Sequence, residues 1–341
     1  MTDPTFNPAD DSLIPTTPAV SGDVMAPVGA LPGAVSGTFE QGTQVEGTLE
    51  AGLDLKVRSQ WSYARMRFFR HRLALIGLVG LIVIFGAGVF ANYVAPYSYE
   101  EINLGHLQFL APPSSAHPFG TDSLGRDELS RVIWGIRTSM EVGVFVAVVS
   151  TIVGLVIGAI AGFFGGWLDN LLMRVTDLVL TLPLLAVLLT ASALLGQGNQ
   201  WRVSMILVFF FWTGIARVVR GIYLSLREKE YVEAAKACGA GDSRLMFRHI
   251  LPNTMGPIVV NATLAVGTAI LVEAALSFLG FGIKPPTPSL GTLVNDARTN
   301  PEAWWLTVFP GLTIVAIVLC VNFVGDGLRD ALDPTQRRMR A

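Results

Sequence analysis

The sequence predicts an all-α membrane protein with six transmembrane helices. Just over half of the 341 residues are hydrophobic (51%) and only 15% are charged, whereas a soluble domain carries about a quarter charged residues. Apolar runs of about 20 residues, the length that crosses a bilayer, recur along the chain. The predicted spans are residues 73–95, 138–168, 178–196, 203–224, 256–280 and 304–325.

The residues before the first span fall into two parts. Residues 1–55 hold eight acidic residues, no Lys or Arg, and much Pro, Gly, Ser and Thr. They are therefore predicted to form a disordered acidic tail, either a dispensable extension or a regulatory segment. Residues 56–72 are basic with interleaved aromatic residues, which is typical of an amphipathic helix on anionic lipid. Membrane lipid is accordingly an expected partner.

Glycine, proline and arginine residues inside the spans indicate how the helices pack and bend. Gly154, Gly158 and Gly162 repeat every four residues in span 138–168, and such a face lets another helix of the same chain approach closely. Pro183 predicts a bend near the start of span 178–196. Arg217 and Arg220 lie near one end of span 203–224, where long cationic side chains reach the interface.

Span 256–280 contains the candidate pathway or gate residues, Glu273, Asn261 and Thr268. A carboxylate within a span faces the protein interior or a water-filled cavity. Glu273 is therefore either a gate residue or one member of an ordinary pair with a basic group of a partner. Hydrogen bonds between helices explain Asn261 and Thr268 at least as well as contact with a substrate does.

Lys and Arg set the expected orientation. Eighteen of the 24 basic residues fall on the side of the N-terminus and six on the other, so the positive-inside rule predicts that both termini are cytoplasmic. The expected extracytoplasmic segments are 96–137 and 281–303, and the expected cytoplasmic ones include the loop 225–255 and the tail 326–341.

Local charge patterns give three further predictions. In segment 96–137, Asp122 or Ser123 is predicted to cap a short helix that runs through Arg131. Arg137 is expected to pair with Glu141 one turn later. At the inner ends of the second and third spans, a structural charge cluster is predicted from Asp169, Arg174 and Asp177.

The loop 225–255 is a polar, helix-prone block between apolar spans. Gly239 is predicted to end a first helix, Asp242 and Ser243 to cap a second helix over 244–250, and Pro252 to stop it. The first helix presents the carboxylate of Glu233 beside the small Ala234 and Ala235. Small residues let a partner backbone approach, and a carboxylate binds a basic residue.

The spacing within this block resembles the integral membrane subunits of ABC importers. Glu-Ala-Ala stands at 233–235, Gly follows four residues later, and Ile-Leu-Pro begins eleven residues beyond that Gly. Further motifs are similar to the C-type permease subunit of the dipeptide/oligopeptide/nickel family, over roughly residues 60–335. They are Gly-Thr-Asp-Ser-Leu-Gly-Arg-Asp at 120–127, Gly-Gly-Trp-Leu-Asp at 165–169, Leu-Ser-Phe-Leu-Gly-Phe-Gly at 276–282 and Gly-Asp-Gly-Leu-Arg-Asp-Ala-Leu-Asp-Pro at 325–334.

This resemblance implies a type I importer permease in the plasma membrane of a bacterium. Its expected partners are a homologous second permease in a heterodimer, two cytoplasmic ABC ATPase subunits or one fused ATPase, and an extracytoplasmic peptide-binding protein, with no nucleic acid. The residues implied to couple to the ATPase are Glu233, Ala234, Ala235, Gly239, Asp242, Ser243, Leu251 and Pro252.

The chain itself is expected to be non-catalytic. It contains no Gly-x-x-x-x-Gly-Lys-Ser/Thr loop that would cradle ATP phosphates, so ATP and Mg are assigned to the partner ATPases, and no cofactor or metal to this chain. A nickel importer is the alternative within the family, although the four His residues are scattered outside the spans. An ion-coupled secondary transporter is a more distant alternative, which predicts several ionisable residues deep in the spans.

Overall fold

The computed structural model describes residues 60–101, 109–194 and 199–332, and these residues are predominantly helical. Within those ranges, one isolated bridge between Thr121 and Asp127 is the only extended pairing. The predicted acidic tail, 1–55, lies outside the described residues.

The first elements are α2 (Gln60–Phe68), α3 (Arg72–Val89), α4 (Ala91–Val94), α5 (Glu128–Phe164), α6 (Gly166–Thr181) and α7 (Leu184–Leu194). They are followed by α8 (Gln200–Arg227), α9 (Glu230–Ala237), α10 (Asp242–Arg244), the π-helix η2 (Leu245–Ile250), α11 (Leu251–Phe278), α12 (Leu290–Asp296), the 3-10 helix η3 (Ala297–Thr299) and α13 (Trp305–Leu332).

The predicted all-α fold with up to six membrane spans is confirmed. Among the described residues, five helical stretches are long and apolar enough to cross a membrane: α3, α5, α8, the stretch Asp242–Phe278, and α13. The sixth candidate is the pair α6 and α7, which is bent by 82°. The break falls at Leu182 and Pro183, as the proline predicts.

The second predicted span, 138–168, is shifted toward the N-terminus. α5 begins at Glu128 because Asp127, rather than Asp122 or Ser123, caps it by accepting the Ser130 N–H at 2.8 Å. It ends at Phe164 because Gly165 and Gly166 take positive φ angles of 65° and 60°. Residues 169–177, expected as a short inner loop between spans 138–168 and 178–196, instead lie within α6.

Several other boundaries differ from the predictions. α3 ends at Val89, six residues before the end of the predicted span 73–95. α11 begins at Leu251, five residues before the predicted span 256–280. The segment 281–303, predicted as a loop, contains α12, whose Ser289 and Thr292 form a reciprocal capping box. α13 continues through Leu332, well into the predicted tail 326–341.

The glycine repeat of α5 makes a close seam with α8. A β-carbon on Gly154 would lie 2.7 Å from the Trp212 carbonyl oxygen, and one on Gly162 would lie 2.7 Å from the Arg220 carbonyl oxygen. Gly158 meets the Ala216 carbonyl in the same way. The two backbones therefore touch directly, and the predicted packing within the chain is confirmed.

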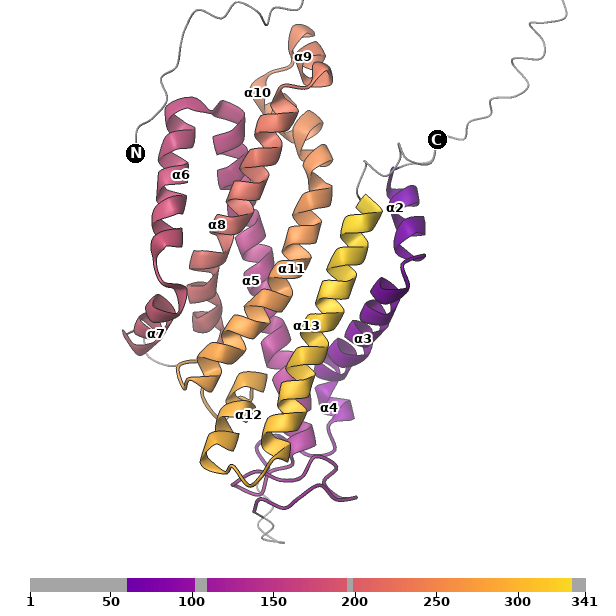
Figure 1. The fold of residues 1–341 in the computed structure, drawn as a ribbon, viewed down its shortest axis with the longest axis vertical. Helices are drawn as coiled ribbons and strands as arrows, with labels where there is room; N and C mark the ends of the chain where they lie inside the picture. Colours follow the sequence, from indigo (N-terminus) through magenta and orange to yellow (C-terminus); the bar gives the residue numbers. More distant parts are fainter. Residues whose placement is uncertain (1–59, 102–108, 195–198, 333–341) are drawn as a thin grey trace, which may run out of the picture. The chain divides into compact units, whose positions relative to one another are not determined.

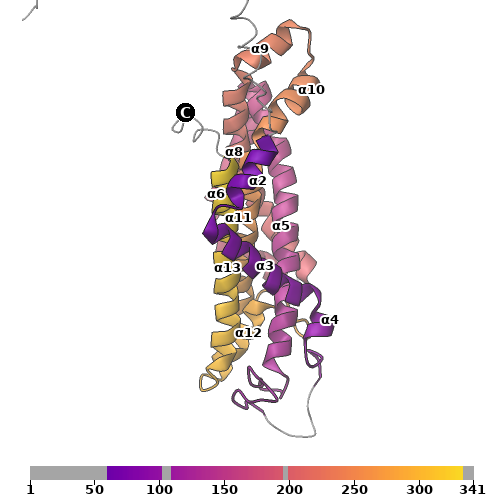
Figure 2. The same ribbon diagram turned by 90° about the vertical axis from the view of Figure 1, so that its right-hand side faces the viewer.

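The remaining helices flank this seam (Figure 1). α9 and α10 lie at one end of α8 and α11, and α12 lies near their other end. In Figures 1 and 2, α3 runs beside α13, and α2 lies near the C-terminal end of α13. There Gly327 of α13 brings its backbone against Ala74 and Phe68.

Candidate functional site

Residues 229–252, the 229–252 segment, connect α8 to α11. α9 begins after Lys229 and ends at Ala237, where Gly239 takes a φ of 83°. The Ala240 N–H donates to the Ala235 carbonyl at 3.1 Å, and the Gly239 N–H donates to the Lys236 carbonyl at 2.9 Å. This left-handed turn closes the helix as predicted.

The second half of the segment differs from the prediction, because Pro252 does not end a helix. The chain passes from α10 through the π-helical turn Leu245–Ile250 into α11, and Pro252 lies in the first turn of α11. Asp242 and Ser243 stand at the start of α10, but Gly241 is its N-cap, with no side-chain hydrogen bond. Proline is common in the first turn of an α-helix, and Pro252 takes that position in α11 directly after the π-helical turn.

Apolar side chains anchor this segment to the spans. Val232, Leu245, Met246 and Ile250 are buried in one cluster with Phe163 of α5 and with Ile215, Val219 and Tyr223 of α8. The Tyr223 hydroxyl also donates to the Met246 carbonyl at 3.5 Å. Arg227 donates to the Phe163 carbonyl at 2.9 Å and so closes the end of α5. The segment is therefore packed directly against α5 and α8.

The opposite face of the segment is exposed. Glu233, Ala234, Gly239, Asp242 and Ser243 are all exposed, whereas Ala235 and Leu251 are partly buried. Most of the predicted coupling residues are therefore open to solvent, Pro252 among them, while Ala235 and Leu251 are partly covered.

Sequence reasoning missed two exposed aromatic residues in this segment. The Phe247 side chain is 63% exposed and Tyr231 is 41% exposed. An apolar ring inside a block rich in charged residues was the available signal, since large exposed apolar groups often mark binding sites. The exposed side chains of the segment thus include a carboxylate, small residues and an aromatic ring.

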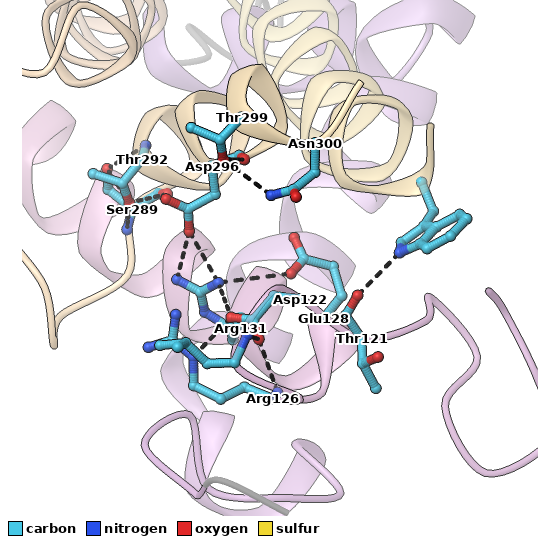
Figure 3. Close-up of polar contacts among 12 residues, drawn as sticks. Thr121, Asp122, Arg126, Glu128, Arg131, Ser289, Thr292, Asp296, Thr299 and Asn300 are labelled. Atoms are coloured by element: carbon cyan, nitrogen blue, oxygen red, sulfur yellow. Dashed lines mark hydrogen bonds and ion pairs between the residues drawn. The ribbon is translucent and has the colours of Figure 1, made fainter. Parts of the chain in front are cut away.

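A second polar site lies at the other end of α5 (Figure 3). Arg131 donates to Asp122 at 2.6 Å and contacts Asp296 of α12 through both terminal nitrogens at 3.1 Å. Arg126 also donates to Asp122, at 2.7 Å. Figure 3 shows Arg131 between Asp296 and Asp122, so one guanidinium holds α5, α12 and the 120–127 turn together.

Glu128 is the poorly satisfied member of that cluster. It is fully buried, and neither carboxylate oxygen has a hydrogen-bond partner among the described residues. Its nearest cation is Arg131, at 3.9 Å. The Trp305 indole of α13 donates to the Thr121 carbonyl at 3.1 Å and so ties α13 to the 120–127 turn.

Glu273 lies in a buried network of hydroxyl groups. It is fully buried and accepts from Ser139 of α5 at 3.0 Å and from Ser277 at 2.7 Å. Ser139 accepts the Leu290 N–H at 3.3 Å, which ties the start of α12 to the network. The structure therefore gives Glu273 serine partners within the chain, where the sequence suggested a gate or a basic partner.

Asn261 and Thr268 lie two turns apart on α11, away from the Glu273 network. The Asn261 amide donates to the Pro257 carbonyl at 2.9 Å, and the Thr268 hydroxyl donates to the Leu264 carbonyl at 3.1 Å. Both bonds stay within α11. The structure does not bring the three predicted pathway residues together.

Of the predicted charge contacts, the Arg137–Glu141 pair is found and the cluster around Arg174 is not. Arg137 and Glu141 form the expected pair at 3.1 Å, and Gln200 adds a hydrogen bond to Glu141 at 2.6 Å. Asp169 and Asp177 bind Arg220 and Arg217 of α8, at 2.5 Å and 2.6 Å. The exposed Arg174 makes no ion pair with them, so the predicted three-residue cluster is wrong and the charges tie α6 to α8 instead.

Comparisons with known proteins agree with these features. Residues 154–338 match the family described as "Binding-protein-dependent transport system inner membrane component", and residues 59–113 match the "N-terminal TM domain of oligopeptide transport permease C". The chain is 41% identical over 276 residues to the oligopeptide transport system permease protein OppC of Mycobacterium bovis, covering 80% of this chain and 94% of the relative. It is 42% identical over 286 residues to the glutathione transport system permease protein GsiD of Shigella flexneri, covering 82% and 92%.

Proposed function

We infer the function from membership of a family, because this chain belongs to the binding-protein-dependent transport system inner membrane components, among the C-type permeases of peptide ABC importers. We propose that it forms half of the translocation pathway of an ATP-driven importer and transmits the motion of ATPase subunits through the 229–252 segment. The observation that carries the proposal is the two-sided segment, with an exposed polar face and a buried face fixed to α5 and α8.

The proposed coupling is mechanical. An ATPase surface engages Glu233 with a basic residue, approaches Ala234 closely, and receives the ring of Phe247. When ATP binding closes the ATPase pair, the segment shifts. Its apolar anchors then carry α5 and α8 between two arrangements, as in other rigid-body transitions. ATP and Mg belong to the ATPases in this proposal, and this subunit contributes no catalytic group.

We propose short peptides as the substrate. One relative is named for oligopeptides and the other for glutathione, which is itself a tripeptide. Both names favour peptides over nickel. The proposed assembly contains a homologous second permease, two ATPases or one fused ATPase, and a peptide-binding protein that delivers the substrate. In this arrangement both termini and the 229–252 segment face the cytoplasm, in accord with the distribution of basic residues.

The pathway assignment changes within this proposal. Glu273 stabilises the attachment of α12, because its two oxygens are already bound by Ser139 and Ser277. Asn261 and Thr268 remain the proposed pathway residues of α11. They are seven residues apart and therefore lie on the same face of the helix.

The proposal is tested by co-expressing the chain with its second permease, ATPases and binding protein, and measuring co-purification and peptide uptake. Glu233→Arg reverses the charge of the docking face, and Gly239→Pro cannot adopt the φ of 83°. Both variants are expected to lose the ATPases and uptake while still assembling with the second permease.

Glu302→Arg is the matched control, since Glu302 is an exposed acid near the start of α13, far along the chain from this segment. It should leave association with the ATPases unchanged. If Glu233→Arg and Gly239→Pro kept both ATPase association and uptake, the coupling role would be wrong. If wild-type complexes took up nickel and no peptide, the substrate assignment would be wrong and the coupling role would stand.

A further inference from the structure

A cavity of about 370 Å³ opens between the start of α3 and the last turns of α13. Its lining combines two apolar side chains, Leu73 and Phe323, with four polar ones, which are His71, Asp326, Arg329 and Asp330. None of these residues belongs to the 229–252 segment or to the cluster around Arg131. The function proposed above gives this cavity no role.

The position of the cavity along the helices places it at a membrane surface. The apolar run of α3 begins at Leu73, directly after the exposed Arg70 and Arg72. The apolar run of α13 ends at Val324, and charged residues begin at Asp326. Both helices therefore pass from apolar to charged sequence at the level of the cavity, which is where lipid headgroups lie.

The polar groups of the cavity carry both signs of charge. His71 Nδ1 accepts the Ala74 N–H at 3.1 Å, so the ring hydrogen sits on Nε2, which faces an Asp330 carboxylate oxygen at 3.6 Å. No hydrogen bond or ion pair joins Asp326 or Arg329 to another described side chain. The cavity thus offers one guanidinium and two carboxylates at headgroup depth.

We propose that this cavity binds the headgroup of an aminophospholipid such as phosphatidylethanolamine. Arg329 binds the phosphate, and Asp326 and Asp330 accept hydrogen bonds from the primary ammonium group. The acyl chains lie along the exposed apolar face of α3, where Leu73 is 50% exposed and Ile76 is 63% exposed. Charge-assisted hydrogen bonds of this kind are the strong ones.

The same chemistry discriminates among common lipids. The quaternary ammonium of phosphatidylcholine has no N–H to donate to the two carboxylates. The headgroup of phosphatidylglycerol is an anion without a cation, and the carboxylates repel it. A headgroup with both a phosphate and a primary amine satisfies all three charged side chains.

The test uses the full-length chain, purified with its second permease in nanodiscs of defined lipid and then extracted for native mass spectrometry. Wild-type protein is expected to retain phosphatidylethanolamine about tenfold better than phosphatidylcholine, the size of one charged hydrogen bond. Asp326→Asn with Asp330→Asn should abolish that preference but keep phospholipid binding. Arg329→Gln should weaken retention of both lipids.

Glu302→Gln, which removes an exposed acid at the other end of α13, is the control and should change nothing. Soluble phosphoethanolamine tests for a site that binds free phosphate esters, and it should not displace the lipid because it lacks acyl chains. Equal retention of the two lipids by wild-type protein would overturn the proposal. So would a preference that survives in the double variant, or displacement by phosphoethanolamine.

Discussion

The two ends of α5 are attached to the rest of the protein by different kinds of contact. At the end near Glu128, buried polar groups bind one another: Arg131 holds Asp122 and Asp296, and Ser139 holds Glu273. At the end near Phe163, apolar side chains make the attachment, and the charged residues of the 229–252 segment face solvent. At the first end the polar groups bind one another within the chain, with Glu128 as the exception, whereas the second end leaves exposed charged groups that a partner can contact. Substitutions at the Glu128 end should therefore change the stability of the protein, whereas substitutions in the 229–252 segment should change its binding to a partner.

The largest effect is expected from Arg131→Met. The Asp122 side chain is 1% exposed, and the substitution removes one of its two guanidinium partners, leaving Arg126 at 2.7 Å. Breaking a buried ion pair by removing one partner costs about 3–5 kcal/mol, and the remaining Arg126 contact places the expected loss at the lower end of that range. We expect a large drop in the thermal midpoint of the purified protein.

Arg137→Met is the matched control for that change. Its pair with Glu141 is more than 30% exposed on both sides, so we expect a loss below about 1 kcal/mol. Equal midpoints for the two variants would show that the Arg131 cluster does not hold the Glu128 end together.

Phe247→Ala tests the 229–252 segment, at the Phe163 end of α5. The ring is 63% exposed, so the stability of the isolated protein should change by less than about 0.5 kcal/mol. Loss of an aromatic contact at the centre of an interface costs about 2 kcal/mol, or about 30-fold in Kd. Binding of the ATPases, measured by titration in detergent, should weaken by that factor. Phe109→Ala, which removes an exposed ring from a different loop, should leave binding unchanged.

Ser277→Ala probes the hydroxyl network around Glu273. The substitution removes the donor at 2.7 Å and the acceptor for the Ile283 N–H. A hydrogen bond within a protein contributes about 1 kcal/mol. We expect a lower thermal midpoint and faster hydrogen exchange in α12.

Ser225→Ala serves as its control, because that exposed hydroxyl only donates to its own helix at 2.9 Å. The network would be judged unimportant if both serine variants exchanged α12 amides at the wild-type rate.

The smallest effect is expected from Glu128→Leu, and its sign is opposite. The carboxylate is buried without a hydrogen bond, and an unsatisfied buried group costs about 1 kcal/mol or more. Replacing it with an apolar side chain of similar length should raise the thermal midpoint. Glu128→Gln should raise the midpoint by a smaller amount. A lower midpoint for Glu128→Leu would mean that the 3.9 Å contact with Arg131 stabilises the cluster.

The sequence predicted the features that depend on local composition. Apolar runs marked the spans, Pro183 marked the bend, and Gly239 marked the turn of the 229–252 segment. These are properties of a few neighbouring residues. The identity of the family also followed, because the spacing of Glu233, Gly239 and Ile250 is itself a local pattern.

The missed features depend on distant partners or on uncommon backbone geometry. Arg131 and Asp296 are 165 positions apart in the sequence, and the residues around each do not indicate the other. Asp169 pairs with Arg220 of α8 and not with Arg174, which is nearer in the sequence, and this partner too could not be inferred from neighbouring residues. The sequence predicts that Pro252 ends a helix, because the π-helical turn that precedes it has no clear sequence signal.

The glycine seam between α5 and α8 has a mechanical consequence. Side chains that interdigitate can slip by changing rotamers, but backbones in direct contact at Gly154, Gly158 and Gly162 have no such freedom. The two helices then act as one lever. α5 has 37 residues, or about 55 Å at 1.5 Å per residue. A tilt of about 5° at the Phe163 end therefore becomes a stroke of about 5 Å at the Glu128 end, by the same helix rise.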